Sequence, residues 1–486
     1  MSSDIGIVRG TALYIGALLG PGLLLLPGLA AHQAGPASIV AWVVLLGASA
    51  LFAVVFAALG VRHPSAGGVW GYATAGLGDR AGRAVAWCFL AGVIAGAPIV
   101  CVIGGNYVAE LTGGGVRVAA TTAALLLAGA LGVVARGLRT SSTVQFGLVA
   151  LLLAVVVGAV ASAAPASAAA NWTPFTPHGW SAVGRAAATL MLAFVGWEAI
   201  APLTTRFAHP RRQLPVVIGI AFAATTVVYL ALGTVTVAAL GPRAGTEVPL
   251  AALLELGLGN AGTAVAAVGA VVLTVGAVLA YMSGAAGLAR ALRGRPAQET
   301  TVPVPRSGGR DLRDRAERDA AVPLSASGGR DPRGQADLDA AVPDLRRGGR
   351  DHGGARPADG PDDSRGTLPA WLALAILASG AILIVPLATG AIDLATLVNV
   401  PTTFFLVVYL GCTAAGWRLL SGVPRACAAV AFGVVAVVLG FCGAALIPAA
   451  LVTAVAVVNR KRRREPADRL THHPSGTPLK AARTRS

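Results

Sequence analysis

Long apolar stretches alternate with short polar segments along almost the whole chain. A helix needs roughly 20 apolar residues to cross the hydrocarbon core of a bilayer. The pattern predicts about 12 spans, at residues 6–32, 37–60, 82–109, 117–136, 142–164, 183–206, 214–240, 261–289, 367–388, 392–416, 424–442 and 443–459. Two amphipathic segments, 63–78 and 248–258, lie outside these spans. The predicted fold class is therefore an all-α membrane protein with about 12 transmembrane helices.

Two segments depart from this pattern and divide the chain into four parts. Residues 1–293 hold the first eight spans, and residues 367–459 hold the last four. Residues 294–366 between them are rich in Gly, Pro, Arg and Asp and repeat with a period of 20 residues, as SGGRD at 307 and again at 327. Such a composition buries too little apolar surface to offset its ordering entropy, so we expect a disordered cytoplasmic insertion. Residues 460–486 form a basic tail, expected on the cytoplasmic side.

The composition argues against a soluble protein. Charged residues make up 12% of the chain and hydrophobic residues 55%, and the mean hydropathy is +0.71, whereas soluble domains carry about 25% charged residues. The net charge of +16 comes mainly from basic residues scattered between apolar runs and in the tail. A nucleic-acid binder would gather them on one folded face, so nucleic acid is not an expected partner. The sequence has no nucleophile–base spacing, paired acids or phosphate loop, and no enzyme is expected.

Basic residues are divided unequally between the two sets of short loops. If the N-terminus is cytoplasmic, the outer loops hold only Arg117, Arg185 and Arg243. The inner loops then hold the larger set: Arg9, Arg62, Arg80, Arg83, Arg136, Arg139, Arg206, Arg211, Arg212, Arg418, Arg425 and the cluster 460–464. Because basic residues favour the cytoplasmic side, we predict a multi-pass protein of the cytoplasmic (inner) membrane with both termini in the cytoplasm. The N-terminal apolar run is too long for a cleaved signal peptide.

Glycine and proline interrupt two predicted spans near their middle. The first reads YIGALLGPGLLLLPG over residues 14–28, and Pro21 within it lacks the N–H that a continuous helix needs. In the sixth span Gly196 and Pro202 flank Glu198, the only acidic residue deep within a span. Unwound backbone there offers N–H groups to a carboxylate and carbonyl oxygens to an ammonium group. Breaks five spans apart are typical of inverted-repeat transporters, although the alternative is that these residues merely kink their helices.

These motifs resemble those of the amino acid–polyamine–organocation (APC) permeases. Gly20-Pro21-Gly22 resembles the Gly-x-Gly unwinding of their first span, and residues 62–78 resemble their second cytoplasmic loop. The Phe-Val-Gly-Trp-Glu motif at 194–198 is similar to their aromatic-x-Gly-x-Glu core in the sixth span. The most similar subgroup is the bacterial efflux permeases for methionine and branched-chain amino acids. The resemblance covers the chain except 294–366 and the extreme tail, and it implies a five-plus-five inverted-repeat core, broken helices 1 and 6, and alternating access.

The resemblance also implies which residues bind the substrate: Leu19, Gly20, Pro21, Gly22, Phe194, Val195, Gly196 and Trp197. Backbone amides of the first four are expected to meet the substrate carboxylate, and backbone at 194–196 its amino group. Phe194 or Trp197 is expected to act as an aromatic gate, and the sequence leaves open which. Glu198 is the proton-coupling candidate, because a carboxyl group in lipid is costly to charge and can exchange a proton. The alternative is a structural acceptor bonded to neighbouring helices.

Other polar residues narrow the function less. The coupling ion stays open because the fifth span lacks a lysine and the eighth has only isolated Thr274 and Ser283; a proton gradient is the expected driving force, with no cofactor or metal. No buried acid except Glu198 can balance a cationic side chain. We therefore expect a secondary active transporter, an antiporter or efflux carrier, for small neutral amino acids. Its expected partners are that substrate and membrane lipids, and the sequence leaves its oligomeric state open. The alternative is a non-transporting amino-acid sensor that signals through 294–366. Four polar residues either line a cavity or join helices: Asn106, Tyr107, Gln145 and Asn399.

Overall fold

The computed structural model describes residues 6–65, 67–137, 142–200, 207–293 and 368–458. The chain separates into two units, one formed by Met1–Leu288 together with Thr367–Ser486 and the other by Ala289–Gly366. The insertion predicted at 294–366 and the basic tail at 460–486 lie outside the described residues. The first unit, which contains the apolar helices, is described below.

Every regular element in the described ranges is helical, so the predicted all-α membrane fold is confirmed. Within those ranges, nine helical stretches are long and apolar enough to cross a membrane. Their main helices are α3 (Ser38–Arg62), α5 (Asp79–Thr112), α6 (Gly115–Ala135), α7 (Ser142–Ala163), α10 (Pro210–Leu240), α12 (Asn260–Arg293), α14 (Ala370–Ala388), α15 (Leu394–Leu419) and α16 (Val423–Gly440).

Three further predicted spans consist of shorter helical pieces. The first is α1 (Ile7–Leu18), the 3-10 turn η1 (Pro21–Leu24) and α2 (Leu26–Ala34). The sixth begins with α8 (Trp180–Leu190), η5 (Met191–Phe194) and α9 (Trp197–Ile200). The last is η8 (Gly443–Ala445) followed by α17 (Leu446–Val458). The first and sixth spans are therefore broken at Gly20–Pro21 and at Gly196, as predicted. Pro202, the other residue predicted to break the sixth span, lies outside the described residues.

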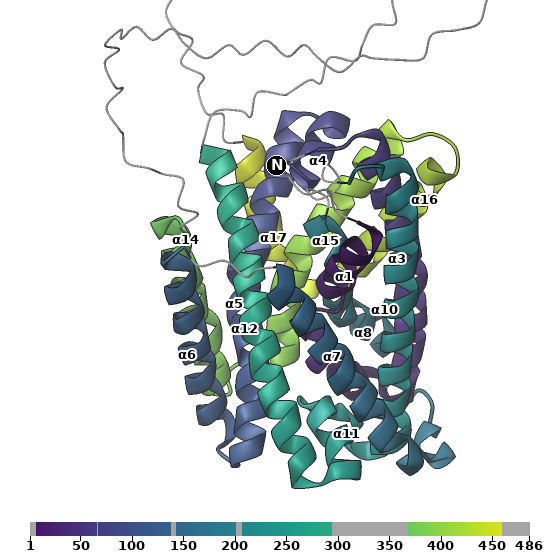
Figure 1. The fold of residues 1–486 in the computed structure, drawn as a ribbon, viewed down its shortest axis with the longest axis vertical. Coiled ribbons are helices and arrows are strands. Elements are labelled where there is room, and N and C mark those ends of the chain that lie inside the picture. Colours follow the sequence, from purple (N-terminus) through teal and green to yellow (C-terminus); the bar gives the residue numbers. More distant parts are fainter. Residues whose placement is uncertain (1–5, 66, 138–141, 201–206, 294–367, 459–486) are drawn as a thin grey trace, which may run out of the picture. The chain divides into compact units, whose positions relative to one another are not determined.

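Two short helices lie at opposite ends of the bundle (Figure 1). α4 (Val69–Leu77) lies at one end and α11 (Pro249–Leu258) at the other. They correspond to the amphipathic segments predicted at 63–78 and 248–258. The two ends are called the α4 end and the α11 end below.

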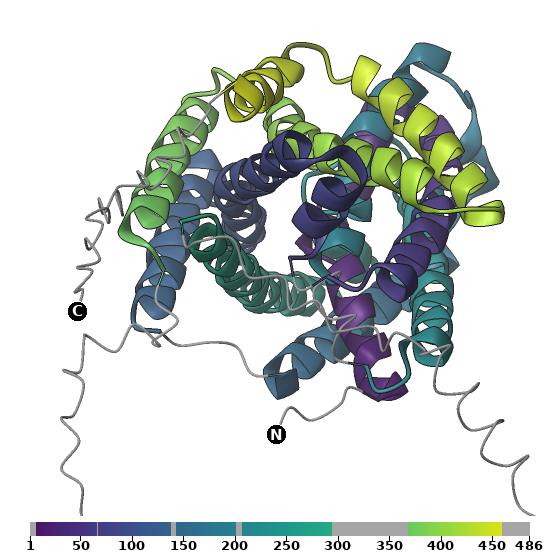
Figure 2. The ribbon, with the colours of Figure 1, turned by 90° about the horizontal axis from the view of Figure 1, so that it is seen from above.

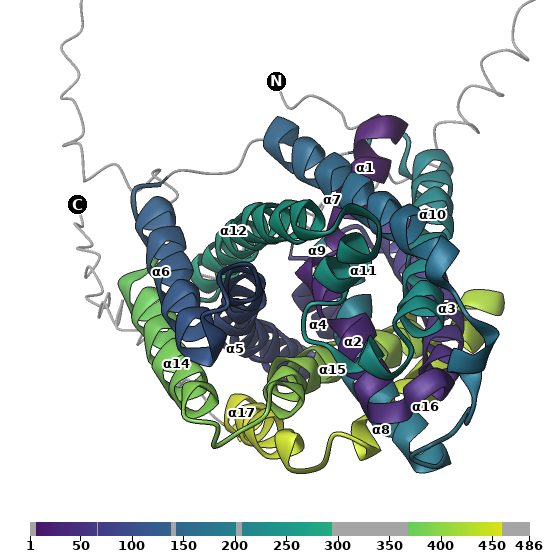
Figure 3. The ribbon, with the colours of Figure 1, turned by 90° about the horizontal axis from the view of Figure 1, so that it is seen from below.

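The helices differ in how much of their surface other helices cover. Within the most apolar stretch of each, 67% of residues are buried in α5 and 61% in α15, against 22% in α14 and in α16. α6, α14, α16 and α17 lie along the rim of the bundle (Figures 2 and 3). Large apolar side chains on these rim helices are exposed, such as Leu125 at 73% and Ile382 at 69%. A helix that is apolar all round suits lipid contact, so α5 and α15 belong to the core and the rim helices to the lipid boundary.

Candidate substrate site

The first break opens the backbone between α1 and η1. α1 ends at Leu18, and Gly20 adopts an extended conformation with ψ of 177° before Pro21 begins the 3-10 turn. The amide N–H groups of Gly20 and Gly22 donate to no other residue in the described ranges. Unpaired N–H groups at the start of a helical turn favour an anionic group. The first break therefore presents the backbone donors that a carboxylate needs.

The second break lies against the first. η5 ends at Phe194, and Val195 is extended, with φ of −72° and ψ of 121°. A Cβ built on Gly196 would lie 2.5 Å from the carbonyl oxygen of Ala17 and 2.9 Å from its carbonyl carbon. Because backbone atoms cannot yield cheaply, only glycine lets the two broken helices approach this closely.

Three tyrosines from neighbouring helices hydrogen-bond the carbonyl groups that the breaks release. The Tyr229 hydroxyl of α10 lies 2.7 Å from the Leu18 oxygen and 2.6 Å from the Ala193 oxygen. Tyr107 of α5 donates to the Leu24 carbonyl at 2.6 Å. Tyr409 of α15 bonds the second break, with its hydroxyl 2.8 Å from the Phe194 oxygen. An unpaired carbonyl in lipid costs several kcal/mol, so these phenols make the broken helices tolerable.

Glu198 follows the second break directly and is buried, with 2% of its surface exposed. Its Oε2 atom accepts the N–H of Gly196 at 2.9 Å and lies 2.7 Å from the Tyr409 hydroxyl. Its Oε1 atom is buried without a partner among the described residues. Glu198 thus bonds its own break and α15, and it does not line the cavity described next.

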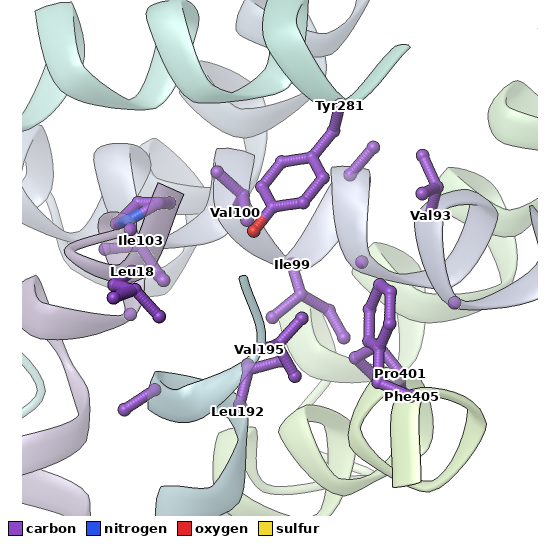
Figure 4. A pocket seen from close by; sticks show the side chains of 17 residues that line it. Leu18, Val93, Ile99, Val100, Ile103, Leu192, Val195, Tyr281, Pro401 and Phe405 are labelled. Carbon is purple, nitrogen blue, oxygen red and sulfur yellow. The ribbon is translucent and has the colours of Figure 1, made fainter. Parts of the chain in front are cut away.

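A cavity lies where the two breaks face α5, α12 and α15 (Figure 4). About 600 Å³ there is free of protein atoms, a volume that includes the part open to solvent. Glycines and apolar side chains dominate its lining: Leu18, Gly20, Pro21, Gly22, Gly92, Val93, Gly96, Ala97, Ile99, Val100, Ile103, Leu192, Ala193, Val195, Tyr281, Pro401 and Phe405. The Tyr281 hydroxyl points into this space (Figure 4). The cavity therefore combines an apolar wall with backbone polar groups at the breaks.

The predicted substrate-binding residues divide into two groups. Gly20, Pro21, Gly22 and Val195 line the cavity. The others lie beside it: Leu19 and Gly196 at the breaks, and Phe194 and Trp197 with their rings packed elsewhere.

The two aromatic rings proposed as a gate pack against the surrounding helices. Phe194 lies 6.1 Å from Trp42, measured between ring centroids. Trp197 lies 6.3 Å from Tyr14 and donates from Nε1 to the Ser49 hydroxyl at 3.1 Å. Neither ring lines the cavity: Phe194 packs toward α3, and Trp197 packs toward α1 and α3.

Sequence reasoning missed two aromatic wall residues and the helix that faces them. Tyr281 of α12 and Phe405 of α15 are the aromatic side chains among the lining residues. A Cβ on Gly92 would lie 3.0 Å from two ring atoms of Phe405, so this glycine makes room for the ring. The spacing Gly92-x-x-x-Gly96 in α5 was the available signal, because small residues four apart mark one close-packed helix face.

The comparison with known families agrees with this geometry. The family model for amino acid permeases matches residues 5–294, which is more than half of the chain. The chain belongs to the amino acid permease family. Its broken helices and apolar helices make the permease a multi-pass membrane protein, and its relatives are transporters, so the permease is not an enzyme.

Individual relatives cover different shares of the permease. The uncharacterised amino acid permease YecA of Bacillus subtilis is 32% identical over 305 residues, 63% of this chain and 71% of its own length. The L-methionine/branched-chain amino acid exporter YjeH of Escherichia coli is 31% identical over 222 residues, 44% of this chain and 51% of its own length. The branched-chain amino acid permease BcaP of Bacillus subtilis is 26% identical over 275 residues, 52% of this chain and 59% of its own length.

Proposed function

We propose that the permease exports neutral, apolar amino acids across the cytoplasmic membrane by alternating access. The single observation that supports this most is the meeting of two broken helices at an apolar cavity. Half-helix ends at mid-membrane suit both charged groups of an amino acid, and an apolar wall suits an uncharged side chain. The names of two relatives, an L-methionine/branched-chain amino acid exporter and a branched-chain amino acid permease, point the same way.

The carboxylate of the substrate is assigned to the first break in this proposal. The unpaired N–H groups of Gly20 and Gly22 are the donors, and the lack of a side chain at Gly20 leaves the cavity open beside them. A Cβ built on Gly20 would have only the Tyr281 hydroxyl nearby, at 3.9 Å. That hydroxyl is a further donor within reach of an anionic group.

The ammonium group of the substrate is assigned to carbonyl oxygens of both breaks. Tyr229 carries one phenol proton but faces two carbonyls, those of Leu18 and Ala193. One proton serves one acceptor at a time, and each carbonyl has two lone pairs, so acceptor capacity is left beside the cavity. An ammonium group can use that capacity without displacing Tyr229.

The proposal that the substrate has a neutral side chain follows from the lack of charged groups among the residues that line the cavity. The lining side chains are apolar except for the Tyr281 hydroxyl, and Glu198 is not among them. A guanidinium or ammonium group on the substrate side chain would therefore enter the cavity without a counter-charge, which lipid-buried charges require.

Proton coupling through Glu198 is the mechanism that we propose for driving transport. The Tyr409 hydroxyl lies between the Glu198 carboxyl group and the Phe194 carbonyl, at 2.7 Å and 2.8 Å. When Glu198 is protonated, it can donate to Tyr409, which then donates to the carbonyl. When Glu198 is charged, the phenol proton turns to it and the carbonyl loses its donor. The protonation of Glu198 thus changes the hydrogen bonding of the second break.

The orientation in the membrane also stays a proposal. Arg62, Arg80 and Arg83 flank α4, whereas Arg243 belongs to the 3-10 turn η7 (Gly241–Gly245) before α11. We place the α4 end and both termini in the cytoplasm because basic residues concentrate there.

Flux through the purified permease in proteoliposomes tests the proposal. Labelled leucine and methionine are measured with and without a pH gradient, for the wild type, Gly20→Val and Gly129→Val. A Cβ at Gly20 clashes with no atom, but a valine side chain there would occupy the cavity beside the unpaired N–H groups of the first break. A Cβ at Gly129 in α6 meets no atom within 4 Å, so Gly129→Val is the matched control. Loss of flux in Gly20→Val, with flux retained in Gly129→Val, supports the proposal that the permease is a carrier with its substrate site at the first break. Leucine binding without any flux in the wild type would instead favour the amino-acid sensor.

A further inference from the structure

Helix α5 forms the largest part of the cavity wall and contains a proline in the middle of that wall. α5 supplies seven of the 17 lining residues, and Pro98 lies between them, with Gly96 shortly before it and Val100 shortly after it. Proline has no N–H to bond the carbonyl of Ile94, four residues earlier, and its ring crowds that carbonyl. The backbone of α5 is therefore weakened at the turn that faces the cavity.

The hydroxyl of Ser379, on the rim helix α14, supplies a donor in place of the missing N–H. It donates to the Ile94 carbonyl at 2.6 Å. The next residue of α14 lies against the proline: a Cβ built on Gly380 would lie 3.8 Å from the Pro98 ring and 2.7 Å from the Leu127 side chain of α6. In a membrane, hydroxyl groups of neighbouring helices are one of the few sources of donors for a carbonyl that proline frees. α14 thus packs directly on the weakened turn of α5.

The opposite face of this turn lies toward the cavity and α15. Residues four apart share one face of a helix, and residues two apart lie on nearly opposite faces. Ile94 and Pro98 therefore face α14, whereas Gly96 faces the cavity. A Cβ built on Gly96 would lie 3.6 Å from the Cβ of Pro401 in α15. One turn of α5 thus accepts the α14 hydroxyl on one side and contacts α15 on the other.

We propose that Ser379 is a positioning residue of the substrate site, which holds the turn of α5 at Pro98 and so fixes the space between α5 and α15. Without the hydroxyl, the Ile94 carbonyl has to find a donor in its own helix, and membrane helices do this by a local change to 3-10 or π geometry. Such a change rotates Gly96 away from Pro401. Ser379 does not line the cavity, so it acts on the site through α5 alone. That this space holds the substrate side chain rests on the proposed function.

Formation of a disulfide between α5 and α15 tests the positioning role without any substrate. The 3.6 Å between the two Cβ atoms suits a disulfide in the double variant Gly96→Cys/Pro401→Cys. Copper phenanthroline is added to the full chain in proteoliposomes, and mass spectrometry of the linked peptides separates this disulfide from any that involve the five native cysteines. The rate is compared after adding Ser379→Ala, Ser379→Thr or Ser283→Ala. The Ser283 hydroxyl is also half-buried, but it bonds the Leu279 carbonyl of its own helix at 2.7 Å.

Ser379→Ala should slow disulfide formation about fivefold, the change in an equilibrium that one buried hydrogen bond is worth. Ser379→Thr keeps a hydroxyl and should restore the rate, and Ser283→Ala should leave it unchanged. Pro98→Ala gives α5 back its N–H, so Ser379→Ala should have no further effect in that background. An equal effect with and without Pro98 would mean that the serine only supports the packing of α14, and it would overturn the proposal.

Two further outcomes also overturn the proposal. One is a rate in Ser379→Ala that is unchanged or faster. The other, which decides the matter if Pro98→Ala inserts poorly, is a rate in Ser379→Thr as slow as that in Ser379→Ala. In the chain without added cysteines, Ser379→Ala should also change the leucine-to-alanine flux ratio by about the same factor. If the wild type transports neither amino acid, the disulfide rates still test the role of Ser379, so the positioning role and the proposed function fail separately.

Discussion

Adding one methyl group at Gly96 should narrow the range of substrates. Gly96 lines the cavity, and a Cβ built there would lie 3.6 Å from the Cβ of Pro401, an ordinary van der Waals contact. Alanine therefore fits without moving the backbone and only removes space between α5 and α15. Gly92→Ala, one turn away, would perturb the cavity wall more than Gly96→Ala, because its Cβ would lie 3.0 Å from the Phe405 ring.

The size of the change in substrate selectivity follows from the one carbon atom that the substitution adds to the cavity wall. A misfit of one methylene in an apolar pocket is worth about 1–3 kcal/mol, or about 10-fold to 200-fold in discrimination. In Gly96→Ala, transport of leucine and methionine should therefore fall by about tenfold or more relative to alanine, whose short side chain needs no space there. Initial rates of the three labelled amino acids in proteoliposomes give this ratio, with Gly129→Ala as the control that fills no cavity. An unchanged leucine-to-alanine ratio in Gly96→Ala would refute the placement of the substrate side chain between these helices.

Three further outcomes are expected. Glu198→Gln should flatten the pH dependence of flux while leaving binding largely intact, because glutamine keeps the bonds to Gly196 and Tyr409 but exchanges no proton; a pH profile identical to the wild type removes Glu198 from coupling. Tyr229→Phe should lower the free energy of unfolding by about 1–3 kcal/mol, as a buried carbonyl loses its donor, and thermal unfolding should show no such loss in Thr225→Val, whose hydroxyl bonds its own helix. Deletion of 297–363 should leave transport near the wild-type rate, and a correctly inserted but inactive deletion variant would assign that segment a function.

The positions of the two breaks were predictable because their causes are local. Pro21 lacks the N–H of a continuous helix, and two adjacent glycines remove the side chains that would stabilise one. The break at Gly196 was predictable, but the structural reason why glycine is needed there was not. Its hydrogen atom faces the carbonyl group of Ala17, about 180 residues earlier in the chain, and no local pattern records that approach.

The partners of the broken backbone were not predictable. Tyr107, Tyr229 and Tyr409 lie in spans that are apolar on every side, so periodicity assigns no direction to their hydroxyls. The rings of Phe194 and Trp197 raise the same difficulty. Phe194 ends a 3-10 turn, and Trp197 comes after the extended Val195, so neither side chain has the direction that a continuous α-helix would give it. Phe405 and Tyr281 line the cavity instead.

The hydrogen bonds at the breaks also limit how tightly the permease can hold its substrate. Three phenols bond the carbonyl groups of Leu18, Leu24 and Phe194, so these carbonyls have donors within the protein itself. A substrate ammonium group adds to or replaces bonds that exist beforehand, and the net gain from such an exchange is about 0.5–1.5 kcal/mol for each bond. Under the proposed function, affinity then comes mainly from the apolar wall and from the unpaired N–H groups of Gly20 and Gly22. A carrier has to release what it binds on the opposite face, and carbonyl groups that keep their phenol donors after the substrate leaves make that release less costly.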